Sequence, residues 1–142
     1  MILNTSHPIE TFVPQRPPML LLSRIITATE ESIDSEWDIP ADCLFIQDNH
    51  LQPTGIMEHA AQTAAALTGV RCKAHEEEVR IGYIGEIRQA MVYSLPAVGD
   101  TLHTHLAIQA EVGDISLVSV VVRQGEEAIM KCQLKIFLSD AD

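Results

Sequence analysis

Residues 53–67 read PTGIMEHAAQTAAAL, and this stretch decides the fold. Its apolar residues occupy several sides of a helix, so it predicts a buried helix, and its many alanines let strands pack closely against that helix. Thr54 is the expected N-cap, and Glu58 places a carboxylate in the expected first turn, where the helix dipole favours negative charge. Gly69 is the expected end of the helix.

The segments before this helix predict strands and a loop. Three prolines within Pro14–Pro18 exclude a regular helix or a central strand, because proline lacks a backbone donor. The apolar run Met19–Ile26 predicts a buried strand, and the alternation over Ser32–Ile39 predicts a second strand. Asp42–Gln52 is expected to form a loop.

The chain after Glu78 predicts several long antiparallel strands, with turns at Gly99, Gly113 and Gly125. Alternating residues mark two buried faces: Leu102, Thr104, Leu106, Ile108, Ala110 and Val112 in one strand, and Ala128, Met130, Cys132, Leu134, Ile136 and Leu138 in another. The sequence therefore predicts an α+β fold, a single domain over residues 1–142 in which one antiparallel sheet wraps one long buried helix. Dimerisation is the expected way to cover the sheet edges.

Charge and composition exclude several classes of function. The formal net charge of −11 repels phosphate backbones, so we expect no nucleic-acid partner. No stretch is long and apolar enough to span a bilayer, and Met1–Glu10 lacks the pattern of a signal peptide, so a cytoplasmic location is expected. The three cysteines match no metal or redox spacing and are expected to be reduced thiols in or near the core. His103 and His105 share a strand face without a third ligand, so we expect them to face solvent and bind no metal.

Four motifs follow one another along the chain. They are the Arg-Pro-Pro stretch and apolar run of Arg16–Ile25, the Glu-His-Ala-Ala-Gln of Glu58–Gln62, the Gly-Tyr-Ile-Gly that begins Gly82–Gln89, and the Val-Gly-Asp turn within Pro96–Leu102. In this order they resemble the 3-hydroxyacyl-(acyl carrier protein) dehydratases, which have the hotdog fold. The nearest resemblance is to the divergent branch linked to aryl-polyene and flexirubin-type pigment synthesis.

The resemblance implies dehydration of a 3-hydroxyacyl thioester to the 2-enoyl thioester. This reaction needs a base for the proton beside the carbonyl, an acid for the leaving hydroxyl and donors for the carbonyl oxygen. The resemblance implies that Glu58 is the helix carboxylate and His50 the loop histidine, with the carboxylate contributed by the partner subunit. The backbone N–H groups of Gly55 and Ile56 are the implied donors to the carbonyl oxygen.

Residues around this pair receive further expectations. Gln62 lies at i+4 from Glu58 and is expected to orient the carboxylate or a backbone group. Met57 is expected to contact an acyl chain, and His59 is expected to be structural. The family histidine lies in a Gly-His-Phe-Pro-Gly stretch that is shortened here, because His50 comes only eight residues before Glu58.

The resemblance also implies partners. The substrate is an acyl thioester on acyl carrier protein or on coenzyme A, no cofactor is expected, and the chain is expected to form a homodimer, a higher hotdog oligomer or a hetero-oligomer. Arg71, Lys73 and Arg80 form the local basic group that an acidic carrier protein would meet. Two alternatives remain open: an acyl thioesterase that uses Glu58 alone, and a non-catalytic subunit that pairs with an active dehydratase.

Overall fold

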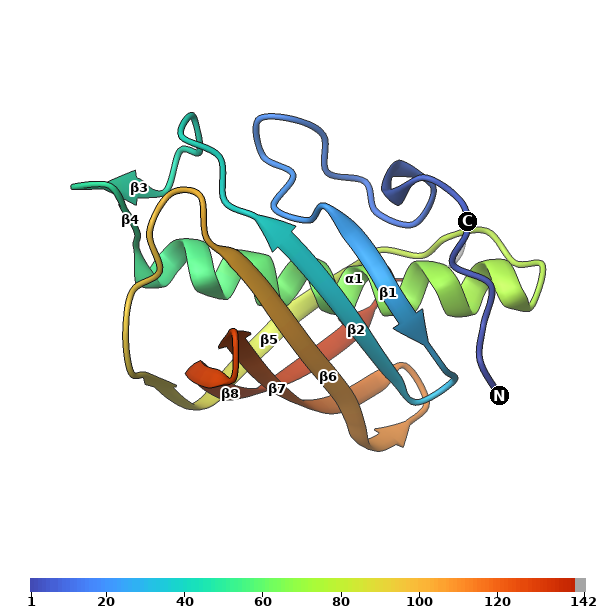
Figure 1. Cartoon of the computed structure of the whole chain (residues 1–142). Helices are drawn as coiled ribbons and strands as arrows, with labels where there is room; N and C mark the ends of the chain where they lie inside the picture. The colour runs from blue at the N-terminus through green and yellow to red at the C-terminus, as the bar shows by residue number, and fades with distance from the viewer. Residues whose placement is uncertain (140–142) are drawn as a thin grey trace.

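The computed structural model describes residues 1–139. Its elements, in chain order, are η1 (Ile9–Thr11), β1 (Arg24–Ala28), β2 (Ser32–Asp38), β3 (Ile46–Gln47), β4 (His50–Leu51), α1 (Pro53–Ala74), β5 (Gly82–Val92), β6 (Thr101–Val112), β7 (Ile115–Gln124) and β8 (Glu127–Leu138). Figure 1 shows α1 running across one face of the sheet, with β3 and β4 at its N-terminal end.

The main sheet has six strands in the order β1-β2-β6-β7-β8-β5. All its neighbouring pairs are antiparallel, and α1, the single long helix of residues 1–139, contacts β1, β2, β5, β6 and β7. The predicted α+β arrangement of one buried helix against one antiparallel sheet is therefore confirmed. No helix of residues 1–139 is both long and apolar enough to cross a membrane.

The helix is longer than predicted and begins differently. Gln52 is the N-cap and makes no capping hydrogen bond through its side chain, while Pro53 is the first helical residue. The expectation of Thr54 as N-cap is therefore wrong, because the fixed φ of proline suits the first turn and the helix starts two residues earlier than expected. Glu58 consequently lies in the second turn, and the first turn contains no acidic residue.

Gly69 does not end the helix, which continues to Ala74. A Cβ atom at this position would lie 2.1 Å from the backbone oxygen of Phe12. Glycine is therefore required at this position by the N-terminal segment, which crosses the helix here, and not by a turn of the backbone. The helix ends instead at His75, whose N–H donates to the carbonyl of Arg71.

The strand predicted for Met19–Ile26 begins only at Arg24. Leu21 and Leu22 are buried as expected, but no strand pairs with them. The N–H of Leu21 donates to the side chain of Gln62, and its carbonyl accepts from His59, so helix side chains take the place of a neighbouring strand.

The other predicted strands are confirmed, and one hairpin was missed. The buried face predicted for β6 is wrong at Ala110 and Val112, which are exposed, because the register shifts between Ile108 and Ala110. β2 alternates in burial over Ser32–Asp38, and the three glycine turns all have positive φ. The predicted loop before the helix contains the β3–β4 hairpin, in which Gln47 pairs with His50. Asp48 and Asn49 between them have φ of 53° and 63°, values typical of a two-residue type I′ turn. Strands of two residues are too short to leave an alternating pattern in the sequence.

Strand β5 forms one edge of the sheet, with β8 as its single neighbour among the described strands. Its large apolar side chains are exposed rather than buried. They include Tyr83, Ile84, Ile87 and Met91, and their exposed fractions range from 37% to 59%. This edge therefore presents both free backbone groups and an apolar surface.

We expect Gly69→Ala to destabilise the fold, although alanine is the better helix former by about 1 kcal/mol. The new methyl group would overlap the Phe12 carbonyl, so the free energy of unfolding should fall by about 1–3 kcal/mol in urea titrations. Gly82→Ala is the matched control, because its Cβ would meet the flexible Cγ2 of Ile136 at 3.2 Å. An equal effect of both variants would contradict the assigned role of Gly69.

Candidate active site

A cavity of about 210 Å³ lies between α1 and β5 and contains Glu58. Its wall on the helix side is made of small side chains, and Gly82–Ile84 of β5 face them. The lining residues are Gln15, Glu58, Ala61, Ala64, Ala65, Thr68, Gly82, Tyr83, Ile84 and Ile136. The alanine-rich face that makes the helix thin thus leaves room for a ligand beside the one carboxylate that lines this cavity.

Gln62 holds Glu58 as the i+4 spacing predicts. Its Nε2 donates to Glu58 Oε2 at 3.2 Å and to the backbone oxygen of Met19 at 2.7 Å. Its Oε1 accepts from the N–H of Leu21 at 2.6 Å. The half-buried carboxylate is therefore connected through one amide to the segment that precedes β1.

His59 is buried and points away from the Glu58 cavity. Its Nδ1 lies 2.8 Å from the carbonyl oxygen of Leu21, so Nδ1 must carry the proton and donate it. Its Nε2 then accepts from the hydroxyl of Thr104 at 2.7 Å, and its ring stacks on Trp37. Burial lowers the pKa of His59 to about 4, although the bond to Leu21 acts in the opposite direction. His59 is thus a neutral, fully paired core residue.

His50 lies at the start of β4 and is exposed. Its Nδ1 donates to the backbone oxygen of Asp48 at 2.7 Å, which leaves Nε2 as an acceptor. The hairpin is held by the bond from Leu51 N–H to the Pro96 carbonyl, 2.8 Å long. His50 does not line the Glu58 cavity, and within residues 1–139 no hydrogen bond or ion pair joins the two side chains. One chain therefore does not bring the expected acid and base together.

The N-terminal amides of α1 are largely occupied. The N–H groups of Gly55 and Ile56 both donate to the Gln52 carbonyl, at 2.9 and 3.1 Å. Both residues are buried, and a Cβ at Gly55 would lie 2.5 Å from Leu51 Cδ1, so glycine here also serves the packing of the hairpin. Met57 is half-buried and packs against the core.

A second cavity of about 260 Å³ adjoins the first near the C-terminal half of α1. The two cavities share Ala64, Thr68 and Ile136 in their walls. The second one has an apolar floor that includes Leu67 and Leu106. Together they follow α1, with apolar walls around Ala64 and Leu67 and charged side chains, among them Arg71 and Glu111, at the far end.

Arg71 and Arg80 border the second cavity, but both are already paired. Arg71 makes two bonds of 2.9 Å to Glu111, which hold the pKa of that carboxyl below its ordinary value. Arg80 contacts Asp114 at 3.0 Å. The basic group expected from the sequence is therefore largely neutralised by these carboxylates.

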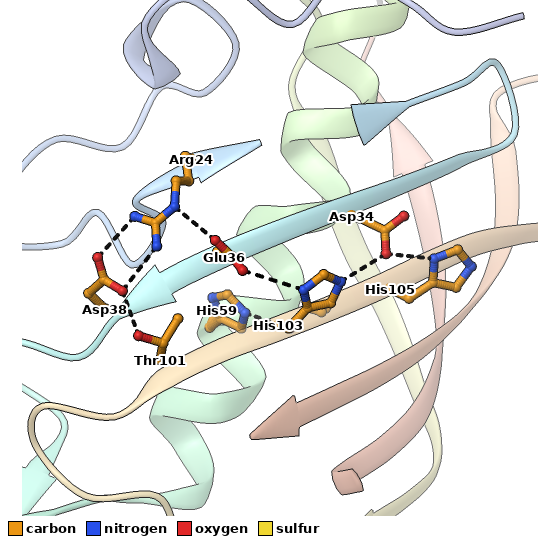
Figure 2. Close-up of polar contacts among 9 residues, drawn as sticks. Arg24, Asp34, Glu36, Asp38, His59, Thr101, His103 and His105 are labelled. Carbon is orange, nitrogen blue, oxygen red and sulfur yellow. Dashed lines mark hydrogen bonds and ion pairs between the residues drawn. The ribbon is translucent and has the colours of Figure 1, made fainter. Parts of the chain in front are cut away.

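A polar network that the sequence did not lead us to expect lies on β1, β2 and β6, on the face of the sheet that points away from α1. Figure 2 shows it running from Arg24 through Glu36 and His103 to Asp34 and His105. Both histidines approach the same oxygen of Asp34, at 3.2 and 3.1 Å. The alternating acids of β2 lie opposite the alternating histidines of β6. These two alternating patterns were the feature of the sequence from which the network could have been predicted.

Arg24 ends the network beside Asp38 (Figure 2). Its guanidinium lies 2.9 Å from Asp38 Oδ2 and, with Thr101, holds the pKa of that carboxyl below its ordinary value. His103 and His105 are about half exposed, as expected, and within residues 1–139 no group of three or more His, Cys, Asp or Glu side chains is arranged to hold a metal ion. The network therefore joins three strands and is separate from Glu58.

The fold identifies the class of protein as the hotdog proteins. Similar solved structures include the dehydratase heterocomplex ApeI:P from Xenorhabdus doucetiae, with a TM-score of 0.87 and 16% identity over 94% of this chain and 92% of that chain. The Escherichia coli PaaI protein from the phenylacetic acid degradation operon has a TM-score of 0.65 and 10% identity over 80% of each chain. A hypothetical thioesterase protein with coenzyme A from Streptococcus pneumoniae has a TM-score of 0.67 and 8% identity over 83% of this chain and 86% of that chain.

Within this class, the model of the ApeP-like family, described as ApeP dehydratase, matches residues 7–142. The chain belongs to that family, so the predicted resemblance to a divergent hotdog dehydratase branch is confirmed. A comparison with curated proteins finds no significant match.

The buried His59 should make stability depend on pH. Its pKa is about 4 in the folded protein and about 6.5 when unfolded, so the unfolded chain binds an extra proton between these values. The free energy of unfolding should fall by up to about 3 kcal/mol as pH drops from 6.5 to 4. Urea titrations of His59→Gln should show a flatter pH dependence in this window, whereas the exposed control His7→Gln should keep the wild-type slope. Parallel curves for wild type and His59→Gln would contradict this assignment.

Proposed function

We propose that this protein takes part in the dehydration of a 3-hydroxyacyl thioester on acyl carrier protein to the 2-enoyl thioester. The observation that carries the proposal is Glu58, a carboxylate held by Gln62 in a cavity walled by alanines and β5. Membership of the ApeP-like dehydratase family supports the same reaction. The apolar walls shared by the two cavities, at Ala64 and Ile136, suit an acyl chain that extends from Glu58.

The roles of the two proposed catalytic residues follow from their surroundings. Glu58 would give its proton to the leaving hydroxyl, because it is the one carboxyl group in the wall of the cavity where the chain would bind. His50 would take the proton beside the thioester carbonyl through Nε2, which is free to accept while Nδ1 donates to Asp48. We keep Gly55 and Ile56 as the proposed site for the carbonyl oxygen, where ligand binding must compete with the Gln52 carbonyl.

Because His50 does not line the Glu58 cavity, the arrangement supports a site completed by a second subunit. We propose that a hotdog subunit pairs with the exposed edge of β5, next to the Gly82–Ile84 wall of the cavity. That subunit would supply the base that faces Glu58, while His50 would act as the base at the site whose carboxyl group comes from the partner. The similar Xenorhabdus protein is described as part of a dehydratase heterocomplex, which supports a second, different chain as this partner.

The same separation favours a second candidate function. A chain whose own histidine does not reach its carboxylate could serve as a non-catalytic subunit of an active dehydratase. It would then contribute the acyl path and the β5 edge, while both reacting groups would come from the partner.

We expect Glu58→Gln to lower the rate of water loss by about a hundred- to ten-thousandfold, the usual contribution of a general acid. His50→Ala should have an effect of similar size. Mass spectrometry of a 3-hydroxyacyl carrier-protein substrate would measure the product, for the chain alone and together with a hotdog partner. Glu126→Gln, in the β7–β8 turn, is the matched control and should keep the wild-type rate.

The outcomes of this assay distinguish the proposed dehydratase from the alternative functions. Full activity of Glu58→Gln would contradict the proposed mechanism, and release of free acid would indicate a thioesterase. Full activity of His50→Ala in a complex that still needs Glu58 would assign the base to the partner.

The proposed interface can be tested by its assembly. Ile87 is 50% exposed on β5, and a lysine there would place a charge between two sheet edges. Ile87→Lys should therefore shift the molar mass measured by light scattering from that of a complex to that of a single chain. Val112→Lys is the matched control, because Val112 is 79% exposed beside the β6–β7 turn. An intact Ile87→Lys complex would place the interface elsewhere.

A further inference from the structure

Gln15 carries a buried acceptor without a partner. Its Oε1 is the one buried side-chain nitrogen or oxygen atom of residues 1–139 that has no hydrogen-bond partner. Leaving such an atom unpaired is unfavourable, and native proteins do so rarely, often at functional sites. This atom therefore needs an explanation.

The same glutamine lines the Glu58 cavity. Two other polar side chains of this wall have partners, since Thr68 donates to the carbonyl of Ala64 and Glu58 accepts from Gln62, while Tyr83 is largely exposed. The remaining wall is mostly alanine and isoleucine. Gln15 thus places an unpaired acceptor, closed to solvent in the free chain, in the wall of a space that also contains a carboxyl group, and a ligand reaches it when the amide turns toward that space.

The backbone around Gln15 is held firmly. Phe12 and Val13 are buried, with exposed fractions of 0% and 3%. The guanidinium of Arg16 donates to the carbonyl of Val13 at 2.7 Å and to the carbonyl of Gln15 itself at 2.8 Å. The backbone that carries the amide is therefore largely preorganised, which lowers the entropic cost of binding.

We propose that Gln15 Oε1 accepts a hydrogen bond from the 3-hydroxyl of a 3-hydroxyacyl chain bound beside Glu58. This inference rests on the proposed function and names a residue that determines its specificity. A hydroxyl is the one donor that such a chain carries near its reacting carbons, and the 2-enoyl product has none. Gln15 thus favours the substrate over both the product and a saturated chain.

The reaction balances with Gln15 in this role. The C2–H bond breaks and its proton goes to the base, while its electron pair forms the C2–C3 double bond. The C3–O bond breaks, and the oxygen takes a proton from the acid to leave as water. Gln15 gives and receives no proton, so it is a binding residue that orients the hydroxyl and then loses its partner as water departs.

The test uses two probes that cannot react as thioesters, because an amide replaces the thioester: 3-hydroxyoctanoyl-pantetheine amide and octanoyl-pantetheine amide. Calorimetry with the full chain should show that the wild type binds the hydroxylated probe about tenfold more tightly. Gln15→Met should remove this preference while it keeps the wild-type affinity for the octanoyl probe, which also shows that the variant is folded. Gln109→Met, at an exposed glutamine of β6, is the matched control and should keep the preference.

Three results would overturn the proposal. They are equal binding of both probes by the wild type, an unchanged preference in Gln15→Met, and no binding of either probe by the wild type. Because the probes do not turn over, a hydroxyl preference that depends on Gln15 would stand even if no dehydration were found. Conversely, an active dehydratase without this preference would retain the proposed function and exclude Gln15.

Discussion

Two side chains of α1 hold the backbone of Leu21, and the arrangement around Glu58 depends on this connection. Gln62 accepts from its N–H and His59 donates to its carbonyl, so both polar groups of a buried residue are satisfied without a neighbouring strand. Burying these groups unpaired would cost about 1–3 kcal/mol each. The segment before β1 is therefore fixed to the helix, and Gln62 uses its remaining donor for Glu58.

The close packing of the N-terminal segment and the sheet against α1 explains why many helix positions carry small side chains. The sheet contacts α1 on one side, and the N-terminal segment crosses it at Gly69, where the Phe12 carbonyl takes the space of a side chain. Alanines on the face toward β5 leave the space that contains Glu58. The small residues of α1 thus have two effects. They let the sheet and the N-terminal segment pack closely against the helix, and they leave the cavity open on the side toward β5.

The sequence predicted the elements whose signal is local. The alternation of β2, the long strands after the helix, the glycine turns and the helix itself all follow from periodicity and backbone preferences. The predicted end of the helix was wrong because glycine is required at position 69 by contact with Phe12, which lies far away in the chain. The strand predicted through Leu21 was wrong for a similar reason, since hydrophobicity shows that a residue is buried but not which group pairs with its backbone.

In the candidate site, too, the residues with a local sequence signal were predicted and the others were not. Glu58 and Gln62 were predicted as site residues from the family motif, and their hydrogen bond follows from their helical spacing. Gln15 left no signal, because an unpaired acceptor is a property of the folded cavity rather than of a motif. The Arg24 to His105 network had a signal in two alternating strands, but the register that brings Asp34 opposite His105 appears only when the strands pair.

The position of Glu58 next to β5 has a consequence for how activity would be controlled. The cavity wall and the exposed sheet edge are parts of the same strand, so a subunit that pairs with β5 would also cover the cavity. On the proposed assignment, the free chain holds its carboxyl and its acyl path ready but lacks the group that faces them. Exclusion of water and completion of the acid–base pair would then occur in a single step, on association. Assembly would thereby act as the condition for chemistry, and the apolar surface of β5 would serve both binding and catalysis.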